Sequence, residues 1–245
     1  MFREIKEKMK LLEARKPFDR ETFEAIETLN AVDWAYSCLS LNGSQVTKET
    51  VLKIVSGHFV VEATVEDHAM IERHEDTLKE AARLLEMDND LTERVLNRLC
   101  SKFHSEEMLT YRRGNPVILT FGFNPVYSKD IQSEMEELFR WLYGDDASPE
   151  INSNEILKAA MLHNRFIEIY PYEEYSEEVA IIVMYYFLMQ RGYPPFTIRF
   201  SRQEYYNAVS AYLKKNDIAP FYNCIERSIF NKLDVLLQMT ETSPL

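Results

Sequence analysis

The stretch that decides the fold runs from His163 to Phe196 and reads HNRFIEIYPYEEYSEEVAIIVMYYFLMQRGYPPF. Its beginning completes a helix that we predict from about Glu155 to Ile169, because apolar residues recur there at helical spacing. Pro171 cannot continue that helix, and the hydroxyl of Ser176 can cap a second one. The segment from Val179 to Met189 carries no charge. Because a helix that is apolar on all sides must be buried, we predict that the core forms around this segment.

The rest of the chain also favours helices. We predict them, from capping residues and apolar spacing, over about 20–41, 48–56, 65–87, 91–104, 128–143, 202–215 and 218–239. The exception is Val117 to Phe123, a β-rich run bracketed by Gly-Asn-Pro and Asn-Pro, which predicts a short hairpin. The predicted fold class is therefore all-α, a helical bundle around a buried central helix, with one small β-hairpin.

Composition bounds the class of protein. The chain has 245 residues, of which 46% are hydrophobic, so one domain over 1–245 with a substantial core is expected. Its net charge of −12 argues against a nucleic-acid partner or an anionic membrane surface. Three widely spaced Cys residues suggest reduced thiols and a cytoplasmic location. Neither a signal peptide nor a membrane-spanning run is expected from the sequence.

The central loop and its flanks resemble the Fic family. In that family two helices flank a loop of the pattern HPFx[DE]GNGR, often preceded by H-x-x-[FL]-x-x-I. Here His163, Phe166 and Ile169 fit the preceding run, and YPYEEYSEE follows in place of the loop motif. The resemblance covers roughly 35–230. It implies one Fic-like domain with N-terminal helices over 1–90, a Fic core over 91–200 and C-terminal helices over 201–245.

The departures from the family loop bear on its activity, which is transfer of a nucleotidyl (AMP) group to protein hydroxyls. Tyr170 occupies the position of the family's catalytic His, and a phenol is a poor base at neutral pH. Glu174 fits the family's metal-binding acid. The Gly-Asn-Gly-Arg that would bind the nucleotide phosphates is replaced by Tyr175, Ser176, Glu177 and Glu178.

A carboxylate close to a phosphate charge costs about 1 kcal/mol in water and about 4 kcal/mol at an effective dielectric of 20. The substituted loop therefore predicts a degenerate anion site. There is also a purely structural interpretation. The two Glu residues would then simply stabilise the positive end of the helix, and Tyr170 would be a half-buried structural residue.

Two further regions resemble regulatory and docking parts of the family. One Fic class carries an inhibitory S-x-x-x-E-G helix, whose positions are filled here by Cys38, Asn42 and Gly43. Both partners of the inhibitory ion pair would be missing, or the segment is only a helix ending in an Asn-Gly turn. The predicted hairpin resembles the flap that docks the target, with Leu119, Phe121 and Phe123 as docking residues. Its alternative role is to cover the core.

The leading functional hypothesis is a degenerate Fic-type protein that lacks normal AMP transfer and acts by binding or regulation. The alternatives are an active transferase with a remodelled site using Glu174 and nearby Tyr or Glu residues, and a purely structural helical interaction protein. Magnesium and ATP are expected only if the family activity survives. No metal site is predicted, since His68, Glu72 and Glu75 read as a solvated helix face. A protein partner is predicted, and a homo-oligomer is left open.

Overall fold

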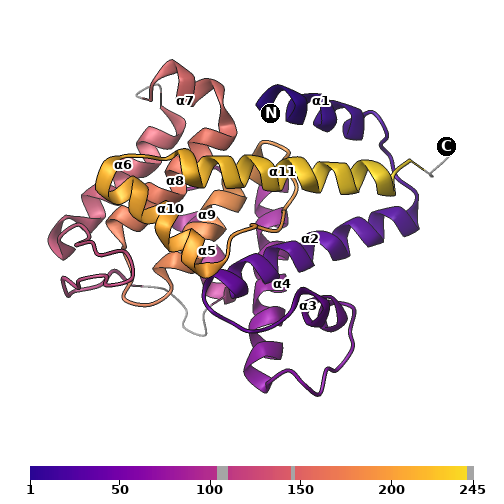
Figure 1. Cartoon of the computed structure of the whole chain (residues 1–245), viewed down its shortest axis with the longest axis horizontal. Helices are drawn as coiled ribbons and strands as arrows, with labels where there is room; N and C mark the ends of the chain where they lie inside the picture. Colours follow the sequence, from indigo (N-terminus) through magenta and orange to yellow (C-terminus); the bar gives the residue numbers. More distant parts are fainter. Residues whose placement is uncertain (104–109, 145–146, 242–245) are drawn as a thin grey trace.

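The computed structural model describes residues 1–103, 110–144 and 147–241, and within these ranges the secondary structure is helical (Figure 1). The helices run α1 Phe2–Glu13, α2 Arg20–Leu41, α3 Lys48–Val55, α4 Val65–Glu86, α5 Glu93–Phe103, η1 Ser128–Asp130, α6 Ile131–Tyr143, α7 Pro149–Ser153, α8 Glu155–Ile169, α9 Ser176–Gln190, α10 Arg202–Lys215 and α11 Ala219–Met239. The predicted helix end at His104 lies outside the described residues. The segment between α6 and α8 contains the short helix α7.

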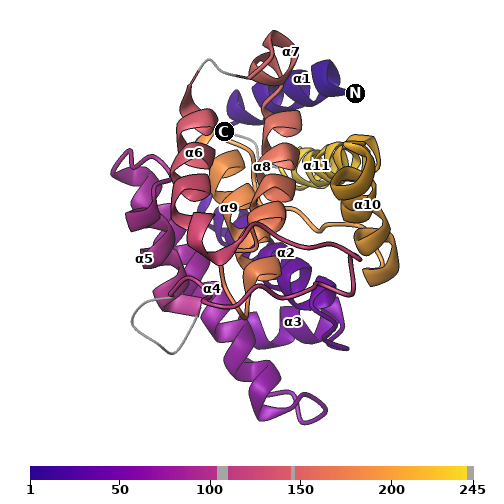
Figure 2. The same ribbon diagram turned by 90° about the vertical axis from the view of Figure 1, so that its left-hand side faces the viewer.

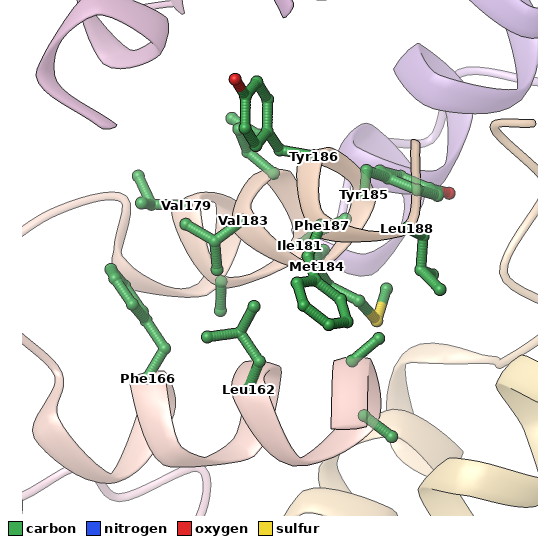
Figure 3. Packing of buried hydrophobic residues seen from close by; sticks show 14 of the residues in the cluster. Leu162, Phe166, Val179, Ile181, Val183, Met184, Tyr185, Tyr186, Phe187 and Leu188 are labelled. Atoms are coloured by element: carbon green, nitrogen blue, oxygen red, sulfur yellow. The ribbon is translucent and has the colours of Figure 1, made fainter. Parts of the chain in front are cut away.

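Helix α9 is the centre of the molecule, as its uncharged sequence predicts. Every residue from Val179 to Leu188 is buried. The most extensive contact between two helices is that of α8 with α9. Figure 3 shows Leu162 and Phe166 of α8 pointing toward α9, while Tyr186 points to the opposite side. Because apolar side chains leave α9 in all directions, helices must cover it all round.

The helix boundaries follow local chemistry. The Asn154 side chain accepts a hydrogen bond from the backbone N–H of Leu157 at 3.1 Å and so caps the start of α8. Gly192, with a φ of +80°, follows the end of α9 and turns the chain toward Pro194 and Pro195. Side-chain caps of this kind stabilise a helix start by about 1 kcal/mol.

The remaining helices surround the central pair. Figure 2 shows α6 and α8 beside α9, with α5 on one flank and α10 and α11 on the other. The main hydrophobic core extends from Ile5 in α1 to Leu233 in α11. A smaller cluster, which includes Val51, Val60 and Ile71, holds α3 and the connection to α4 against α2.

A buried ion pair ties α2 to α11. The carboxylate of Asp33 accepts hydrogen bonds from Lys232 at 2.7 Å, from Thr197 at 2.6 Å and from Lys48 at 2.5 Å. Asp33 and Lys232 are both buried, and removal of one partner would leave the other charge uncompensated. This network therefore fixes the segment after α9 between α2 and α11.

The predicted hairpin is reduced to a turn. Among the described residues no strand is formed, and one antiparallel bridge joins Ile118 to Phe123. Phe121 is completely buried and makes edge-on ring contacts with Tyr205 and Tyr206. The β-rich composition of this run therefore reflects burial of its aromatic residue rather than strand pairing.

Within the described part of the chain, none of the helices combines the length and the apolar character needed to cross a bilayer.

The burial of α9 gives a direct test of the core. We expect Met184→Asp to prevent cooperative folding, since an unpaired buried charge costs several kcal/mol and domains are stable by only about 5–15 kcal/mol. The matched control Met184→Leu should lose less than about 1.5 kcal/mol. Soluble expression and thermal melting by circular dichroism measure both. A soluble Met184→Asp variant with a cooperative melt would contradict this description of the core.

Candidate functional site

The loop between α8 and α9 has two residues in the left-handed region of backbone conformation. Tyr170 ends α8 with φ +49° and ψ +61°, and Tyr175 precedes α9 with φ +66° and ψ +4°. This conformation costs an L-residue about 1–2 kcal/mol, and glycine avoids that cost. Tyr175 stands where the family pattern has glycine, so the loop keeps a glycine-type backbone without glycine. The ring of Tyr175 packs edge-on against Phe103 at 5.1 Å, a contact that offsets part of the cost.

Arg112 fixes the backbone of the loop through hydrogen bonds. Its buried guanidinium donates hydrogen bonds to the carbonyl oxygens of Ile169 at 3.1 Å, Tyr170 at 2.7 Å and Gly114 at 2.6 Å, and also to that of Val126. Its backbone N–H donates to the Pro171 carbonyl at 2.9 Å. The last carbonyls of a helix lack intrahelical donors, and Arg112 supplies them at the end of α8.

Ser176 closes the loop on itself. It was predicted to cap α9, but it is the first residue of that helix and is buried. Its hydroxyl accepts from the Tyr172 N–H at 2.9 Å and donates to the Tyr172 carbonyl at 2.8 Å. The side chain therefore satisfies the loop backbone and turns away from the open side of the loop.

A hollow of about 370 Å³ opens above the loop. The residues that line it are Asn42, Tyr170, Glu174, Tyr175, Glu177, Glu178 and Arg202. Except for Ser176, all of the predicted catalytic and anion-site positions of the loop therefore face one cavity, and Asn42 joins them from the end of α2. We call this cavity the loop pocket. The sequence predicted the loop residues as a group because they are contiguous.

The inhibitory-motif positions lie beside the loop pocket. Asn42 bonds its own helix, donating from the side chain to the Cys38 carbonyl at 2.8 Å. Cys38 is fully buried, and burial together with nearby Glu178 raises the pKa of its thiol. Gly43 lies against Arg202, since a Cβ at Gly43 would sit 2.2 Å from the nearer guanidinium nitrogen. The segment is thus packed beside the site, and its regulatory role stays a prediction.

Arg202 also lines the loop pocket, and no local sequence pattern predicts its place there. It lies in the first turn of α10, and its Nε donates to the Tyr206 hydroxyl at 2.6 Å. Two other arginines near the loop helices do not line the loop pocket: Arg112 donates to backbone carbonyls, and Arg165 lies over the Trp141 ring at 4.6 Å. Only tertiary packing brings α10 across the loop.

Burial and like charge set the ionisation of the loop pocket. Burial, followed by repulsion from Glu177, raises the pKa of Glu178 from 4.5 to about 7. Burial also raises the pKa of Glu177, while Arg202 and a hydrogen bond from Tyr170 act in the opposite direction. Burial and the neighbouring Glu177 raise the pKa of Tyr170 well above 10. Tyr170 is therefore a protonated donor at neutral pH and unsuited to act as a base.

His163, which matched the run before the loop, lies away from the pocket. It is buried, stacks on Phe221 with ring centroids 4.4 Å apart, and its Nε2 lies 3.2 Å from the Tyr205 hydroxyl. Burial lowers its pKa to about 3, so the ring is neutral. It is a core residue.

The predicted docking residues of the flap are divided by the structure. Leu119 is 85% exposed, Phe123 is half-buried, and Phe121 is buried in the core. Phe121 therefore cannot contact a target without unfolding of the turn. The remaining backbone around Leu119 is accessible, and its use for docking stays a prediction.

The described residues contain no group of three or more His, Cys, Asp or Glu side chains that could hold a metal ion. Glu174, which was predicted at the family's metal-binding position, is exposed and lines the loop pocket. The carboxylates of Glu177 and Glu178, in the first turn of α9, line the same pocket and would repel the phosphates of a nucleotide. The residues present therefore do not fit magnesium-ATP.

Known proteins resemble this chain in sequence and in fold. No family model matches the sequence. A protein adenylyltransferase Fic from Nematostella vectensis is 31% identical over 122 residues, which is 49% of this chain and 28% of that protein. A Fic-domain signalling protein from Bacteroides thetaiotaomicron has a TM-score of 0.79 at 20% identity, covering 100% of this chain and 99% of that one. Fic-1 from C. elegans has a TM-score of 0.75 at 16% identity, over 99% and 72% of the two chains.

The chain therefore has the helical fold of Fic proteins, and the resemblance to the Fic family predicted from its sequence is confirmed. The match spans little more than a quarter of the length of the curated relative.

The raised pKa of Glu178 predicts a pH-dependent stability. Between pH 4.5 and about 7 the folded state keeps a proton that the unfolded state has lost, so stability falls as pH rises through this window. Glu178→Gln should remove that loss and be more stable than the parent by about 1–3 kcal/mol at pH 8, with little difference at pH 4.5. Denaturant unfolding at the two pH values measures this.

The matched control for that experiment is Glu174→Gln, at an exposed position of the same loop. It should leave the pH profile of the parent unchanged. Equal stabilities of the parent and Glu178→Gln at pH 8 would show that Glu178 is not buried in the way described.

Proposed function

We propose that this chain is a Fic-fold protein that has lost nucleotidyl transfer and acts by binding a protein partner. The observation that carries the proposal is the pair of carboxylates, Glu177 and Glu178, in the first turn of α9. A helix N-terminus attracts anions through its free N–H groups and its dipole. Here two acids of the chain itself occupy that end and oppose a phosphate group.

The base position supports the same proposal. A general base must release its proton near neutral pH, and Tyr170 holds its proton because burial and Glu177 raise its pKa. Its hydroxyl donates to the Glu177 carboxylate. A substrate hydroxyl would meet a donor at this position, where transfer chemistry needs an acceptor.

The balance of charge in the loop pocket points in the same direction. Three carboxylates, from Glu174, Glu177 and Glu178, face one guanidinium, that of Arg202. A pocket with this excess of negative charge favours a cationic side chain of a partner over a nucleotide. The free thiols of Cys38, Cys100 and Cys224 support the proposal that the protein works in the cytoplasm.

One observation favours a second candidate, an enzyme with a remodelled site. The pKa of Glu178 lies at about 7, which suits a group that exchanges a proton near neutral pH. Such an enzyme would use Glu178 as an acid–base group and Glu174 as the metal-binding acid.

A third hypothesis is a helical interaction protein in which the loop pocket has no role. It predicts that substitutions in the loop leave partner binding unchanged.

Nucleotide binding separates the proposal from the family activity. We expect magnesium-ATP at about 1 mM to shift the melting temperature by less than about 1 °C. A site with a hundredfold smaller dissociation constant would add about 2.7 kcal/mol, which raises the melting temperature of a chain of this size by several degrees. Differential scanning fluorimetry, with magnesium sulfate at equal ionic strength as the control, measures the shift. A shift of several degrees specific to ATP would refute the loss of the nucleotide site.

Restoration of the family loop tests whether the surrounding scaffold still fits a nucleotide. The variant carries Tyr170→His, Tyr175→Gly, Ser176→Asn, Glu177→Gly and Glu178→Arg. These changes return a base of suitable pKa, remove two carboxylates and add a phosphate-binding guanidinium. We expect measurable ATP binding by isothermal titration calorimetry where the parent shows little.

Folding of the restored variant is checked by its melt. Glycine within the start of α9 costs about 1 kcal/mol, whereas glycine at position 175 relieves the left-handed backbone, so a folded protein is expected. The matched control is the same variant with Glu178 retained, which should bind ATP at least about tenfold more weakly. A folded variant that ignores ATP would show that the resemblance extends to shape only.

A further inference from the structure

A large groove lies at the end of α9 opposite the loop pocket. It has a volume of about 1350 Å³ and runs between α1, α2, the C-terminal end of α9 and α11. Apolar side chains make up most of its lining, among them Met9, Leu12, Phe23, Met189, Pro194 and Leu236. Small-molecule sites have volumes of about 300–1,000 Å³, so a groove of this size fits a piece of polypeptide.

The groove continues along the molecule. A second hollow of about 460 Å³ between α2 and α4 shares Asn30, Glu86 and Met189 with it. Phe23 of α2 is 54% exposed and lines the groove. The side-chain oxygen of Asn30, a residue of the shared wall, is buried without a hydrogen-bond partner within the described residues.

The α1 side of the groove is cationic in an otherwise acidic protein. Lys6 and Lys16 are paired with carboxylates of the same chain, Glu155 and Glu13. Lys10 and Arg191 also line the groove, and no ion pair with a carboxylate is formed by either one among the described residues. The Arg191 guanidinium lies over the Phe187 ring at 3.7 Å and donates to the Gln190 side-chain oxygen at 2.8 Å. The acids Glu27 and Glu86 line both hollows and so lie toward the α2–α4 side. The groove thus offers an apolar floor lined by Lys10 and Arg191, two cations that lack a carboxylate partner among the described residues.

Exposed apolar and acidic side chains, which would complement the apolar and cationic groove, lie on the connection between α3 and α4. We call residues 58–66 the tip. Phe59 is 78% exposed, Val61 is 81% exposed and Val65 is 84% exposed, and the acids Glu62 and Glu66 are exposed beside them. Figures 1 and 2 show this connection at one end of the molecule, away from α1. The tip therefore lies apart from the α1 side of the groove in the same chain.

The tip has a defined shape. Val60 is buried in the smaller hydrophobic cluster, and its carbonyl oxygen lies 3.1 Å from Nε2 of His68. Phe59 stacks on the His68 ring, with centroids 4.9 Å apart. Thr64 and Asp67 form a capping box that fixes the start of α4. Because the tip is already ordered, docking it loses little conformational entropy.

We propose that the tip of one copy docks into the groove of a second copy of this chain. The exposed Phe59, Val61 and Val65 would cover the apolar floor, and the Glu62 carboxylate would pair with Lys10 and with Arg191. This contact is heterologous, since each copy uses a different surface, so it generates an open chain or a ring rather than a simple two-fold dimer. The interface is small, and its affinity belongs to the weak class.

The test is self-association of the full chain. Sedimentation velocity over about 5–500 µM protein should show a mass that rises with concentration, and less so at high salt. The double variant Phe59→Ser, Val61→Asp should weaken association at least about tenfold, and so should Lys10→Glu with Arg191→Glu. Adding Glu62→Lys to the second variant should restore association, because the charges are exchanged.

A mixing experiment separates this contact from any other. The tip variant and the groove variant should each be monomeric, and an equal mixture should form a dimer and nothing larger, since it contains one intact tip facing one intact groove. Val117→Asp, at an exposed position away from both surfaces, is the matched control and should associate like the parent. Melting curves confirm that all variants fold. A parent chain that is monomeric at 500 µM, or an association that none of these variants changes, overturns the proposal.

Discussion

The uncharged surface of α9 has to be covered on every side, and the rest of the structure depends on that requirement. The helix α8 packs along one side, while the Tyr186 hydroxyl reaches the backbone carbonyl of Asn89 on another. On a third side Tyr185 stacks on Trp34 of α2 and bonds the Phe196 carbonyl. The hydroxyl groups of both tyrosines therefore have backbone hydrogen-bond partners. This lets an aromatic-rich helix be buried without leaving these hydroxyl groups unsatisfied.

The position of the loop pocket follows from the packing of α8 and α9. Two helices fixed side by side leave few paths for the chain between them, and Arg112 with Ser176 selects one by bonding loop backbone. The side chains at the loop positions contribute little to that selection. Tyr175 even adopts a left-handed backbone conformation that is unfavourable for an L-residue. Its packing against Phe103 offsets only part of that energetic cost. The backbone of the loop is therefore determined by its surroundings rather than by its own sequence.

The sequence was sufficient for α8 and α9, because apolar spacing, Pro171 and Gly192 are local signals of helix start and end. It was misleading at Val117–Phe123, where β propensity was read as strand pairing although Phe121 is held by rings of α10. The loop part of the site could be predicted, since its members are contiguous. Arg112 and Arg202 could not, because each reaches the loop from a distant helix or turn and no local pattern marks an arginine for such a contact.

The bonds from Arg112 to the carbonyls of Ile169 and Tyr170 have a consequence for how such sites evolve. They constrain peptide groups, which every residue type shares, and leave the side chains above them unconstrained. Selection can therefore exchange the acids, bases and aromatics of the loop one at a time while each intermediate keeps a folded chain. The main-chain shape of the loop therefore does not require the side-chain motif, and the two can change independently.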